Sequence, residues 1–280
     1  MKDRLFWSAF FAKKAVIICF AVLCLFVLAA VFAPVLAPYS PTAISLAEKE
    51  MAPSLKHLFG TDSLGRDVLS RMLYGARISL SISLVSVLIG GFSGMILGTL
   101  AGYFGGVVDL VISRCADALI SIPPIVLTIA IGTALGQSML NIMIAVGISS
   151  IPGNIRMMRG KVLSVKERDF VTAARVIGEE NRWIMLRHLI PNCISPLIIS
   201  VAMSLGGAIM AEAALSFLGI GIQPPNPAWG TMVSDGMRFL ETKPYLALIP
   251  GFAIMVVVLS FNIVGDALRD ALDPRIRGNS

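Results

Sequence analysis

The chain has 280 residues, of which 56% are hydrophobic and only 14% are charged, and its mean hydropathy is +0.83. A soluble domain carries roughly 25% charged residues, so the composition excludes an ordinary soluble protein and indicates an integral membrane protein. The net charge of +6 does not indicate a nucleic-acid partner, because the basic residues flank apolar segments and do not line an aromatic-studded face.

About six apolar runs are long enough to cross a membrane, since roughly 20 helical residues span the hydrocarbon core. They lie near residues 15–37, 79–102, 114–136, 139–157, 194–218 and 245–265. The first run is too long for the apolar region of a signal peptide, so we expect an uncleaved span. Pro123 and Pro124 should kink the third run, and Pro152 with Gly153 should break or shift the fourth.

The distribution of Lys and Arg predicts the orientation of the chain. With the amino terminus inside, sixteen of the 23 basic residues fall on the cytoplasmic side. We therefore expect both termini and the basic segment 156–191 to face the cytoplasm. This division gives an amino-terminal tail, first span and external loop in 1–76, a core of spans in 77–266, and a cytoplasmic tail in 267–280.

The segment between the first two spans predicts a helix lying in the outer membrane interface. Thr61 or Asp62 would cap it. Its apolar stripe would contain Val68, Leu69, Met72 and Leu73, while its water-facing side would contain Arg66, Asp67 and Arg71.

Glycine recurs every fourth residue along the second span, which predicts a small-residue face that a second helix can approach closely. The residues are Gly90, Gly94, Gly98 and Gly102. The sequence alone does not say whether the packing partner belongs to this chain. The run Gly91-Phe92-Ser93-Gly94 also matches the G-x-S-G of rhomboid proteases, but neither histidine of the chain can reach Ser93 as a base.

Segment 156–191 predicts a helix, turn and second helix at the membrane surface. Ser164 and Glu167 form a capping box, so a helix should begin at Val165 and end at Gly178. Its apolar residues Phe170, Ala174 and Ile177 recur at i, i+4 and i+7. A second helix should run from Glu180 to Ile190 and stop at Pro191, because proline disfavours helix in the residue before it.

Charged residues within apolar spans are costly and normally face a partner or water. Glu212 lies well inside the fifth span, where it is either a hydrogen-bonded packing residue or a group beside a translocation path. Arg114 and Asp117, at i and i+3, favour a local ion pair over a gate. The sequence contains no P-loop motif and no metal-ligand spacing, so we predict no metal, no cofactor and no catalytic site in this chain.

The basic segment resembles the EAA loop of binding-protein-dependent ABC importer permeases. It reads Thr172-Ala173-Ala174, Gly178 and His188-Leu189-Ile190-Pro191, with Thr172 where the family often has Glu and Ile190 where it often has Leu. Three further segments narrow the resemblance to the C-type subunit of the dipeptide and oligopeptide class: HLFGTDSLGRDVLSRMLYGARISL at 57–80, EAALSFLGIGIQPPNPAWG at 212–230 and NIVGDALRDALDPRIRG at 262–278.

The resemblance implies an all-α integral membrane protein of the type I importer fold, with six transmembrane helices, both ends inside and a cytoplasmic coupling helix. That helix would contact an ATP-binding subunit through Phe170, Ala173, Ala174, Ile177 and Gly178. An outer rim for a substrate-binding protein would contain Gly60, Thr61, Asp62, Gly65, Arg66 and Asp67.

The resemblance also implies the partners. They are a second homologous permease, two ATP-binding subunits that hold ATP and Mg²⁺, an external substrate-binding protein and the lipid of a prokaryotic cell membrane. The expected substrate is a dipeptide or oligopeptide, with nickel, a metal chelate or glutathione as the alternative. A secondary transporter or a channel is a more distant alternative, although no clear inverted repeat is visible.

Overall fold

The computed structural model describes the chain except residues 1–6, 8–9, 12 and 273–280. The described part is helical and contains no strand, apart from one isolated antiparallel bridge between Thr61 and Asp67. Its elements in chain order are α2 (Lys14–Val31), α3 (Ala33–Leu36), η1 (Leu46–Glu48), α4 (Val68–Phe104), α5 (Gly106–Ile120), α6 (Pro124–Leu135), α7 (Met139–Val165), α8 (Asp169–Val176), α9 (Asn181–Trp183), η2 (Ile184–Leu189), α10 (Ile190–Phe217), α11 (Trp229–Met237) and α12 (Tyr245–Leu272).

Four helical segments of the described chain are long and apolar enough to cross a membrane: α2, α4, the continuous stretch Asn181–Phe217, and α12. The α5–α6 pair is a fifth candidate, bent by 95° just before Pro124, so the kink predicted for the third run is confirmed. Of the two outcomes expected for the fourth run, the break is not found, because α7 continues through Pro152, and the shift is confirmed, because the helix extends beyond 157 to Val165.

The interface helix predicted after Thr61 or Asp62 is also wrong. Asp67 is the N-cap instead, and its Oδ2 accepts from Ser70 N at 2.7 Å, so α4 begins at Val68 and runs through the second span without interruption. Arg66, Asp67 and Arg71 are buried and do not face water. They are buried because the preceding loop supplies polar partners for each of them.

The glycine face packs against α7 of the same chain, which confirms the predicted close approach and identifies the partner. A Cβ at Gly94 would lie 2.3 Å from Asn154 Cβ, and one at Gly98 would lie 2.7 Å from Met158 Cβ. Because four successive turns of α4 meet α7 in this way, the two helices form the tightest pair in the described fold.

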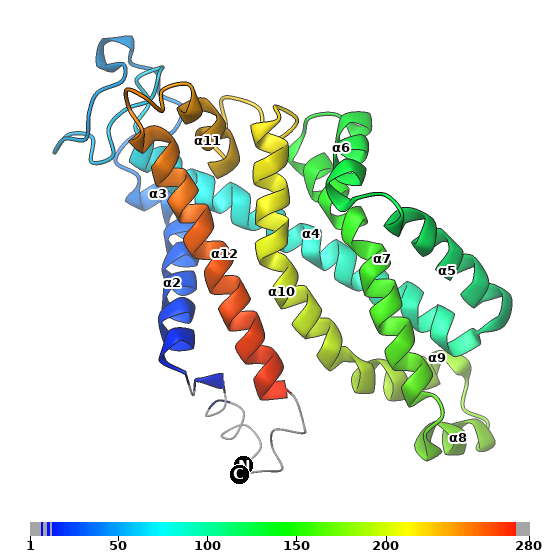
Figure 1. The fold of residues 1–280 in the computed structure, drawn as a ribbon. Coiled ribbons are helices and arrows are strands. Elements are labelled where there is room, and N and C mark those ends of the chain that lie inside the picture. Colours follow the sequence, from blue (N-terminus) through cyan, green and yellow to red (C-terminus); the bar gives the residue numbers. More distant parts are fainter. Residues whose placement is uncertain (1–6, 8–9, 12, 273–280) are drawn as a thin grey trace.

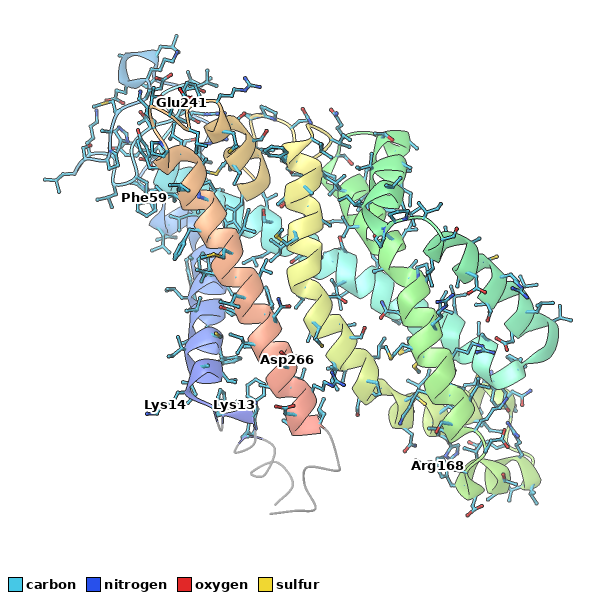
Figure 2. All side chains as sticks on the ribbon, in the orientation of Figure 1. Lys13, Lys14, Phe59, Arg168, Glu241 and Asp266 are labelled. Atoms are coloured by element: carbon cyan, nitrogen blue, oxygen red, sulfur yellow. The ribbon has the colours of Figure 1, made fainter. Side chains whose placement is uncertain are left out.

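Both ends of the described chain lie at the same end of the helix bundle as α8 (Figure 1). Lys13 Nζ contacts Asp270 Oδ2 at 3.1 Å, which joins the start of α2 to the last turns of α12. Figure 2 shows Lys13, Lys14, Arg168 and Asp266 toward this end and Phe59 and Glu241 toward the other. The two described ends and α8 thus lie together as the distribution of basic residues predicted, and the side of the membrane that this end faces stays a prediction.

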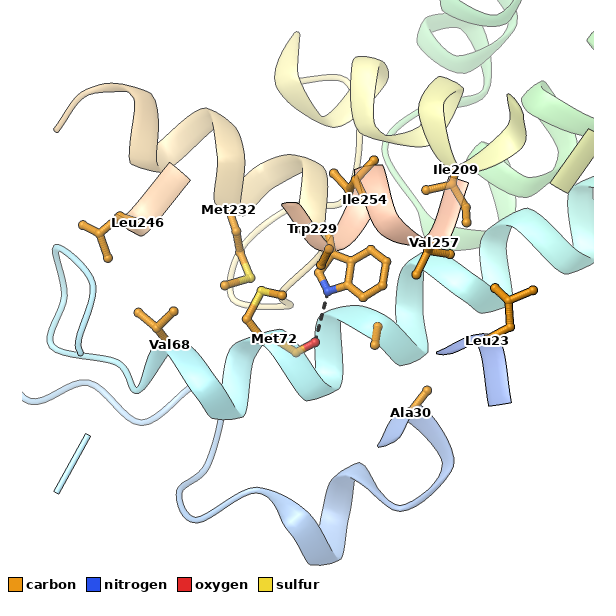
Figure 3. Close-up of a cluster of buried hydrophobic side chains, with 12 residues drawn as sticks. Leu23, Ala30, Val68, Met72, Ile209, Trp229, Met232, Leu246, Ile254 and Val257 are labelled. Carbon is orange, nitrogen blue, oxygen red and sulfur yellow. Dashed lines mark hydrogen bonds between the residues drawn. The ribbon is translucent and has the colours of Figure 1, made fainter. Parts of the chain in front are cut away.

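A buried cluster at the opposite end holds α2, α4, α10, α11 and α12 together (Figure 3). Trp229 is its largest member and is completely buried. Its Nε1 donates to Met72 O at 3.1 Å. The apolar ring is therefore packed in the cluster while its N–H group is hydrogen-bonded.

Candidate coupling helix, cavity and outer loop

The first helix of segment 156–191 begins later than its capping box predicted. Ser164 lies in the last turn of α7 and Glu167 in the turn that follows, while α8 starts at Asp169 without a side-chain cap. The prediction failed because Val162 and Val165 are buried against the hairpin, which favours continuing α7 over ending it at a cap. Asp169 still places a carboxylate in the first turn, where the helix dipole favours it.

Gly178 ends α8 as predicted. Its φ is +81°, in the region that glycine tolerates best. Gly178 N donates to Arg175 O at 3.0 Å, and Glu179 N donates to Ala174 O at 3.1 Å. These two bonds form the Schellman motif, so the glycine fixes the direction in which the chain leaves the helix.

The apolar residues of α8 divide between two faces. Val171 and Ala174 are buried in a cluster with the ends of α4, α7 and α10. Val176 and Ile177 are 82% and 81% exposed, and Ala173 is exposed as well. Ala174 was predicted to face another subunit and instead packs against its own chain, so that part of the prediction is wrong.

The hairpin is fastened to the end of α4 by polar contacts. Lys166 Nζ donates to Gly102 O at 3.0 Å, and the Arg175 guanidinium lies over the Tyr103 ring at 5.3 Å. Tyr103 OH donates to Asn181 Oδ1 at 2.6 Å. These contacts attach the hairpin to the end of α4 and to the start of the following helix.

Pro191 does not end the second helix of the hairpin, which corrects the sequence prediction. The six-residue π-helical segment η2 leads directly into α10, and Pro191 lies in the first turn of α10. The π segment changes the backbone hydrogen-bond register just before the proline, and the first turn of a helix tolerates proline. The hairpin is thus continuous with a membrane-spanning helix.

A cavity of about 460 Å³ lies between α4, α6, α7 and α10. Its lining is apolar apart from hydroxyl groups, and none of the described lining residues is charged. The hydroxyls belong to Ser86, Thr128, Ser149, Ser150 and Ser204. Sequence reasoning missed this cavity, although serines recurring within apolar runs were a usable signal.

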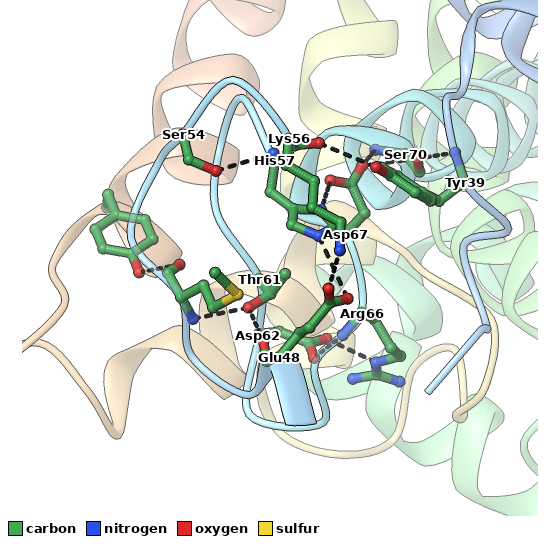
Figure 4. Close-up of polar contacts among 12 residues, drawn as sticks. Tyr39, Glu48, Ser54, Lys56, His57, Thr61, Asp62, Arg66, Asp67 and Ser70 are labelled. Carbon is green, nitrogen blue, oxygen red and sulfur yellow. Dashed lines mark hydrogen bonds and ion pairs between the residues drawn. The ribbon is translucent and has the colours of Figure 1, made fainter. Parts of the chain in front are cut away.

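The loop at residues 37–67 is built around a polar network rather than a helix (Figure 4). Thr61 Oγ1 accepts from Met51 N at 2.8 Å, and Arg66 Nε donates to Asp62 Oδ2 at 2.6 Å. His57 lies between two carboxylates, with Nδ1 at 2.9 Å from Asp67 Oδ1 and Nε2 at 3.5 Å from Glu48 Oε2. The loop therefore has a fixed conformation that its own side chains determine.

The residues predicted to form an outer rim come together in this loop, but most of them face inward. Thr61, Arg66 and Asp67 are buried, and Gly60 and Gly65 adopt φ values of +75° and +73°. They shape the loop, while its exposed surface contains apolar side chains, namely Ile44, Leu46, Leu55 and Leu58.

Ion pairs hold the loop in place and lower the pKa values of two of its glutamates. Lys243 Nζ donates to Glu50 Oε2 at 2.8 Å, and this bond is the main cause that lowers the pKa of Glu50 below its ordinary value. A hydrogen bond from Lys56 likewise lowers the pKa of Glu48, and the same bond raises the pKa of Lys56. Since Lys243 precedes α12, the Glu50 pair attaches the loop to the start of the last helix.

Residues 94–278 match the family described as the binding-protein-dependent transport system inner membrane component. The chain belongs to this family. Residues 4–53 also match the N-terminal TM domain of oligopeptide transport permease C. The permease is therefore a multi-pass membrane subunit of an ABC importer, a family that works with ATP-binding subunits and a substrate-binding protein.

Two curated relatives cover almost the whole permease. The dipeptide transport system permease protein DppC of Alkalihalophilus pseudofirmus is 42% identical over 95% of this chain and 87% of its own length. The glutathione transport system permease protein GsiD of Escherichia coli O157:H7 is 42% identical over 98% of this chain and 90% of its own.

A solved structure supports the fold independently. The structure titled as inward facing conformations of the MetNI methionine ABC transporter matches with a TM-score of 0.57 and 17% identity, covering 73% of this chain and 98% of the matched chain. At that identity the match shows a shared fold only.

Glu212 of the permease is fully buried between α4, α10 and α11. Its carboxylate accepts from Ser79 Oγ at 3.0 Å and from Ser216 Oγ at 2.7 Å. It does not line the hydroxyl-lined cavity, so its surroundings are those of the hydrogen-bonded packing residue that the sequence allowed as one alternative. Asp117 pairs with Arg114 at 3.9 Å as expected, and more closely with Arg156 at 2.6 Å.

Proposed function

We propose that this permease is the C-type transmembrane subunit of an ATP-driven importer of dipeptides and oligopeptides, which an external binding protein delivers. The observation that carries the proposal is α8, a short helix fastened to α4 and α10 that exposes Val176 and Ile177 at the end of the bundle. Two adjacent exposed apolar side chains on an anchored helix suit a groove on another subunit. The dipeptide relative at 42% identity supports the substrate class.

The proposed assembly contains a second homologous permease, two ATP-binding subunits that hold ATP and Mg²⁺, and the binding protein. In the assembly α7 crosses the membrane as the sixth span, and both termini lie in the cytoplasm together with α8. The buried Glu212 holds helices together within the permease and does not contact the peptide.

The proposed mechanism follows the attachments of the hairpin. Closure of the ATP-binding subunits on ATP displaces α8, and the contacts of Lys166 and Tyr103 carry the displacement to α4. The π segment carries it to α10. Since α4 and α10 both line the hydroxyl-lined cavity, the same movement changes which side of the membrane the cavity opens to.

Reconstitution in liposomes tests this proposal. The permease pair is assembled with and without the ATP-binding subunits, and uptake of radiolabelled alanyl-alanine is measured in the presence of the binding protein. The proposal predicts uptake only with ATP, both ATP-binding subunits and the binding protein. Uptake by the permease pair alone would assign the chain to a secondary transporter or a channel.

Glutathione is the second candidate substrate, because the glutathione relative is also 42% identical and covers 98% of this chain. Glutathione is itself a modified tripeptide, so the same machinery could carry it. Competition decides between the two: excess glutathione should leave alanyl-alanine uptake unchanged if peptides are the substrate and should abolish it if glutathione is preferred.

A further inference from the structure

A cluster of charged side chains lines a second pocket, of about 500 Å³, between α5 and α7. It contains Arg114, Arg156 and Arg159 together with Asp109 and Asp117. Arg159 and Asp109 form a closed bidentate pair, with Nε to Oδ1 at 2.5 Å and Nη2 to Oδ2 at 2.6 Å. This pair is electrically neutral and fully occupied.

The other three charged groups, Arg114, Arg156 and Asp117, carry one positive charge in excess. Asp117 Oδ1 accepts from Arg156 Nη2 at 2.6 Å, whereas Arg114 Nη1 lies 3.9 Å from Asp117 Oδ2. The Arg114 and Arg156 side chains are 76% and 56% exposed. One carboxylate thus serves two guanidinium groups that both remain open to the pocket.

The pocket lies in the half of the bundle that is nearer α8. Arg114 is eight residues from Gly106 at the start of α5, and Arg156 is nine residues from Val165 at the end of α7. With a rise of 1.5 Å per residue, these spacings are roughly 12 to 14 Å along each helix. In the predicted spans 114–136 and 139–157 both arginines lie at the edge nearer α8, where a guanidinium group can meet water, a partner or a ligand.

An uncovered face of α7 joins this pocket to the hydroxyl-lined cavity. Ser149, Gly153, Arg156 and Gly160 follow the spacing i, i+4, i+7 and i+11, which places them on one side of the helix. Ser149 lines the cavity, and a Cβ added at either glycine would meet no atom within 4 Å. The described chain therefore leaves an open surface that leads from the neutral cavity to the two arginines.

We propose that Arg114 and Arg156 form a carboxylate-binding site on the inner half of the translocation surface, which takes the C-terminal carboxylate of the peptide. This inference rests on the proposed peptide substrate. A guanidinium group matches a carboxylate with two parallel hydrogen bonds. The long contact of Arg114 with Asp117 leaves it free to bind the peptide, and Arg156 supplies the second donor at the border of the open face.

Charge removal at Arg114 tests the site in the complete transporter reconstituted in liposomes. The probes are alanyl-alanine and its C-terminal amide. Calorimetry first determines the concentration of each probe that saturates the binding protein, and uptake is measured at that concentration. Arg114→Gln should lower uptake of the acid about tenfold, the size expected for one charge-assisted hydrogen bond, and change uptake of the amide less than twofold. Arg114→Lys should retain most acid uptake, and Arg269→Gln serves as an exposed matched control.

A chemical rescue tests charge without relying on the amide. Arg114→Cys is made in a Cys115→Ser background and treated with a cationic or an anionic methanethiosulfonate reagent of similar size. The cationic reagent should restore uptake of alanyl-alanine and the anionic reagent should not. The Cys115→Ser protein with Arg114 intact shows any effect of the reagents elsewhere.

Three results would overturn the site. Equal loss of acid and amide uptake would make Arg114 structural, and unchanged acid uptake would remove its role. Unchanged uptake with loss of copurifying phosphatidylglycerol from Arg114→Gln would assign the arginines to a lipid phosphate. If the wild-type transporter imports neither probe, the proposed peptide substrate fails and the site fails with it.

Discussion

Single glycines determine how closely α4 and α7 approach. The spacing of Gly90, Gly94, Gly98 and Gly102 was sufficient to predict a close helix contact, because small residues at every fourth position form one face. The partner could not be predicted, since any helix with a complementary face satisfies the pattern. The structure shows that the partner is α7, whose backbone atoms as well as side chains meet the glycines.

Gly98→Ala should lower the free energy of unfolding by about 1 to 3 kcal/mol, the usual cost of overpacking, because its Cβ would lie 2.7 Å from Met158 Cβ and 2.8 Å from Ile155 O. Thermal unfolding of the purified permease in detergent measures the change. Gly251→Ala is the matched control, since its Cβ meets no atom within 4 Å and alanine has the higher helix propensity. Equal effects of the two substitutions would show that the α4–α7 contact is not tight.

Substitutions of Glu212 distinguish a packing residue from a residue on the translocation path. Glu212→Ala removes the acceptor of both Ser79 and Ser216 and leaves a cavity, so it should destabilise the permease by about 2 to 4 kcal/mol. Glu212→Gln keeps a carbonyl acceptor and should cost less. Peptide uptake per folded transporter should be unchanged in Glu212→Gln; a change in the KM of uptake would place the side chain on the substrate path.

Among the helical elements, the hairpin of segment 156–191 shows what local patterns can and cannot predict. Gly178 was predictable because a glycine after an amphipathic stretch is a strong C-terminal signal. The Ser164 cap failed because burial of Val165 continues α7 beyond it. The helix end predicted at Pro191 was wrong because a π-helical segment precedes the proline, which then lies in the first turn of α10. Both errors arise where tertiary packing overrides a local signal.

Gly178→Val should abolish ATPase stimulation in the reconstituted transporter while membrane insertion stays intact. A β-branched residue is strained at a φ of +81°, so the chain would leave α8 in another direction and Val176 and Ile177 would lose their placement. Gly219→Val is the matched control, because Gly219 has a φ of +78° with no atom within 4 Å of its Cβ. Stimulated ATP hydrolysis at the wild-type level in Gly178→Val would contradict the role of α8.

The outer loop should detach from α12 in acid. Because the pKa of Glu50 is lowered in the folded protein, its pair with Lys243 stabilises the attachment above the unfolded pKa of about 4.3, and this stabilisation is lost as pH falls through the folded pKa. The protection factors of segment 37–67, which are exchange rates corrected for the intrinsic effect of pH, should therefore be lower near pH 3.5 than at pH 7. In Lys243→Met the protection should already be lower at pH 7 and should depend less on pH; protection that varies with pH as in the wild type would exclude the Glu50–Lys243 pair as the attachment.

At the scale of the whole molecule, the family, the helical class and the common location of both chain ends could be predicted from the sequence. Composition predicts a membrane protein, and the distribution of basic residues predicts that both ends of the chain lie on one side, as the Lys13–Asp270 contact shows for the described ends. The segment after Thr61 was mispredicted, because an apolar stripe at helical spacing looks the same on a surface helix and on the first turns of a long span. Serines recurring within apolar runs indicated a polar surface, but the cavity itself could not be placed, because side chains from α4, α6, α7 and α10 form it together.

We propose that the ATP-binding subunits drive this permease by displacing α8. Copurification tests it most directly: the tagged permease is isolated in detergent from cells that express the complete transporter, copurifying subunits are identified by mass spectrometry, and ATP hydrolysis is assayed in the same fraction. We predict recovery of the second permease and the ATP-binding subunits by the wild type and by Leu55→Asp, which changes an exposed leucine of the outer loop. Val176→Asp combined with Ile177→Asp should lose the ATP-binding subunits and the hydrolysis while remaining expressed. Undiminished recovery by that double variant, or isolation of the wild-type permease alone in a stable form, would contradict the account.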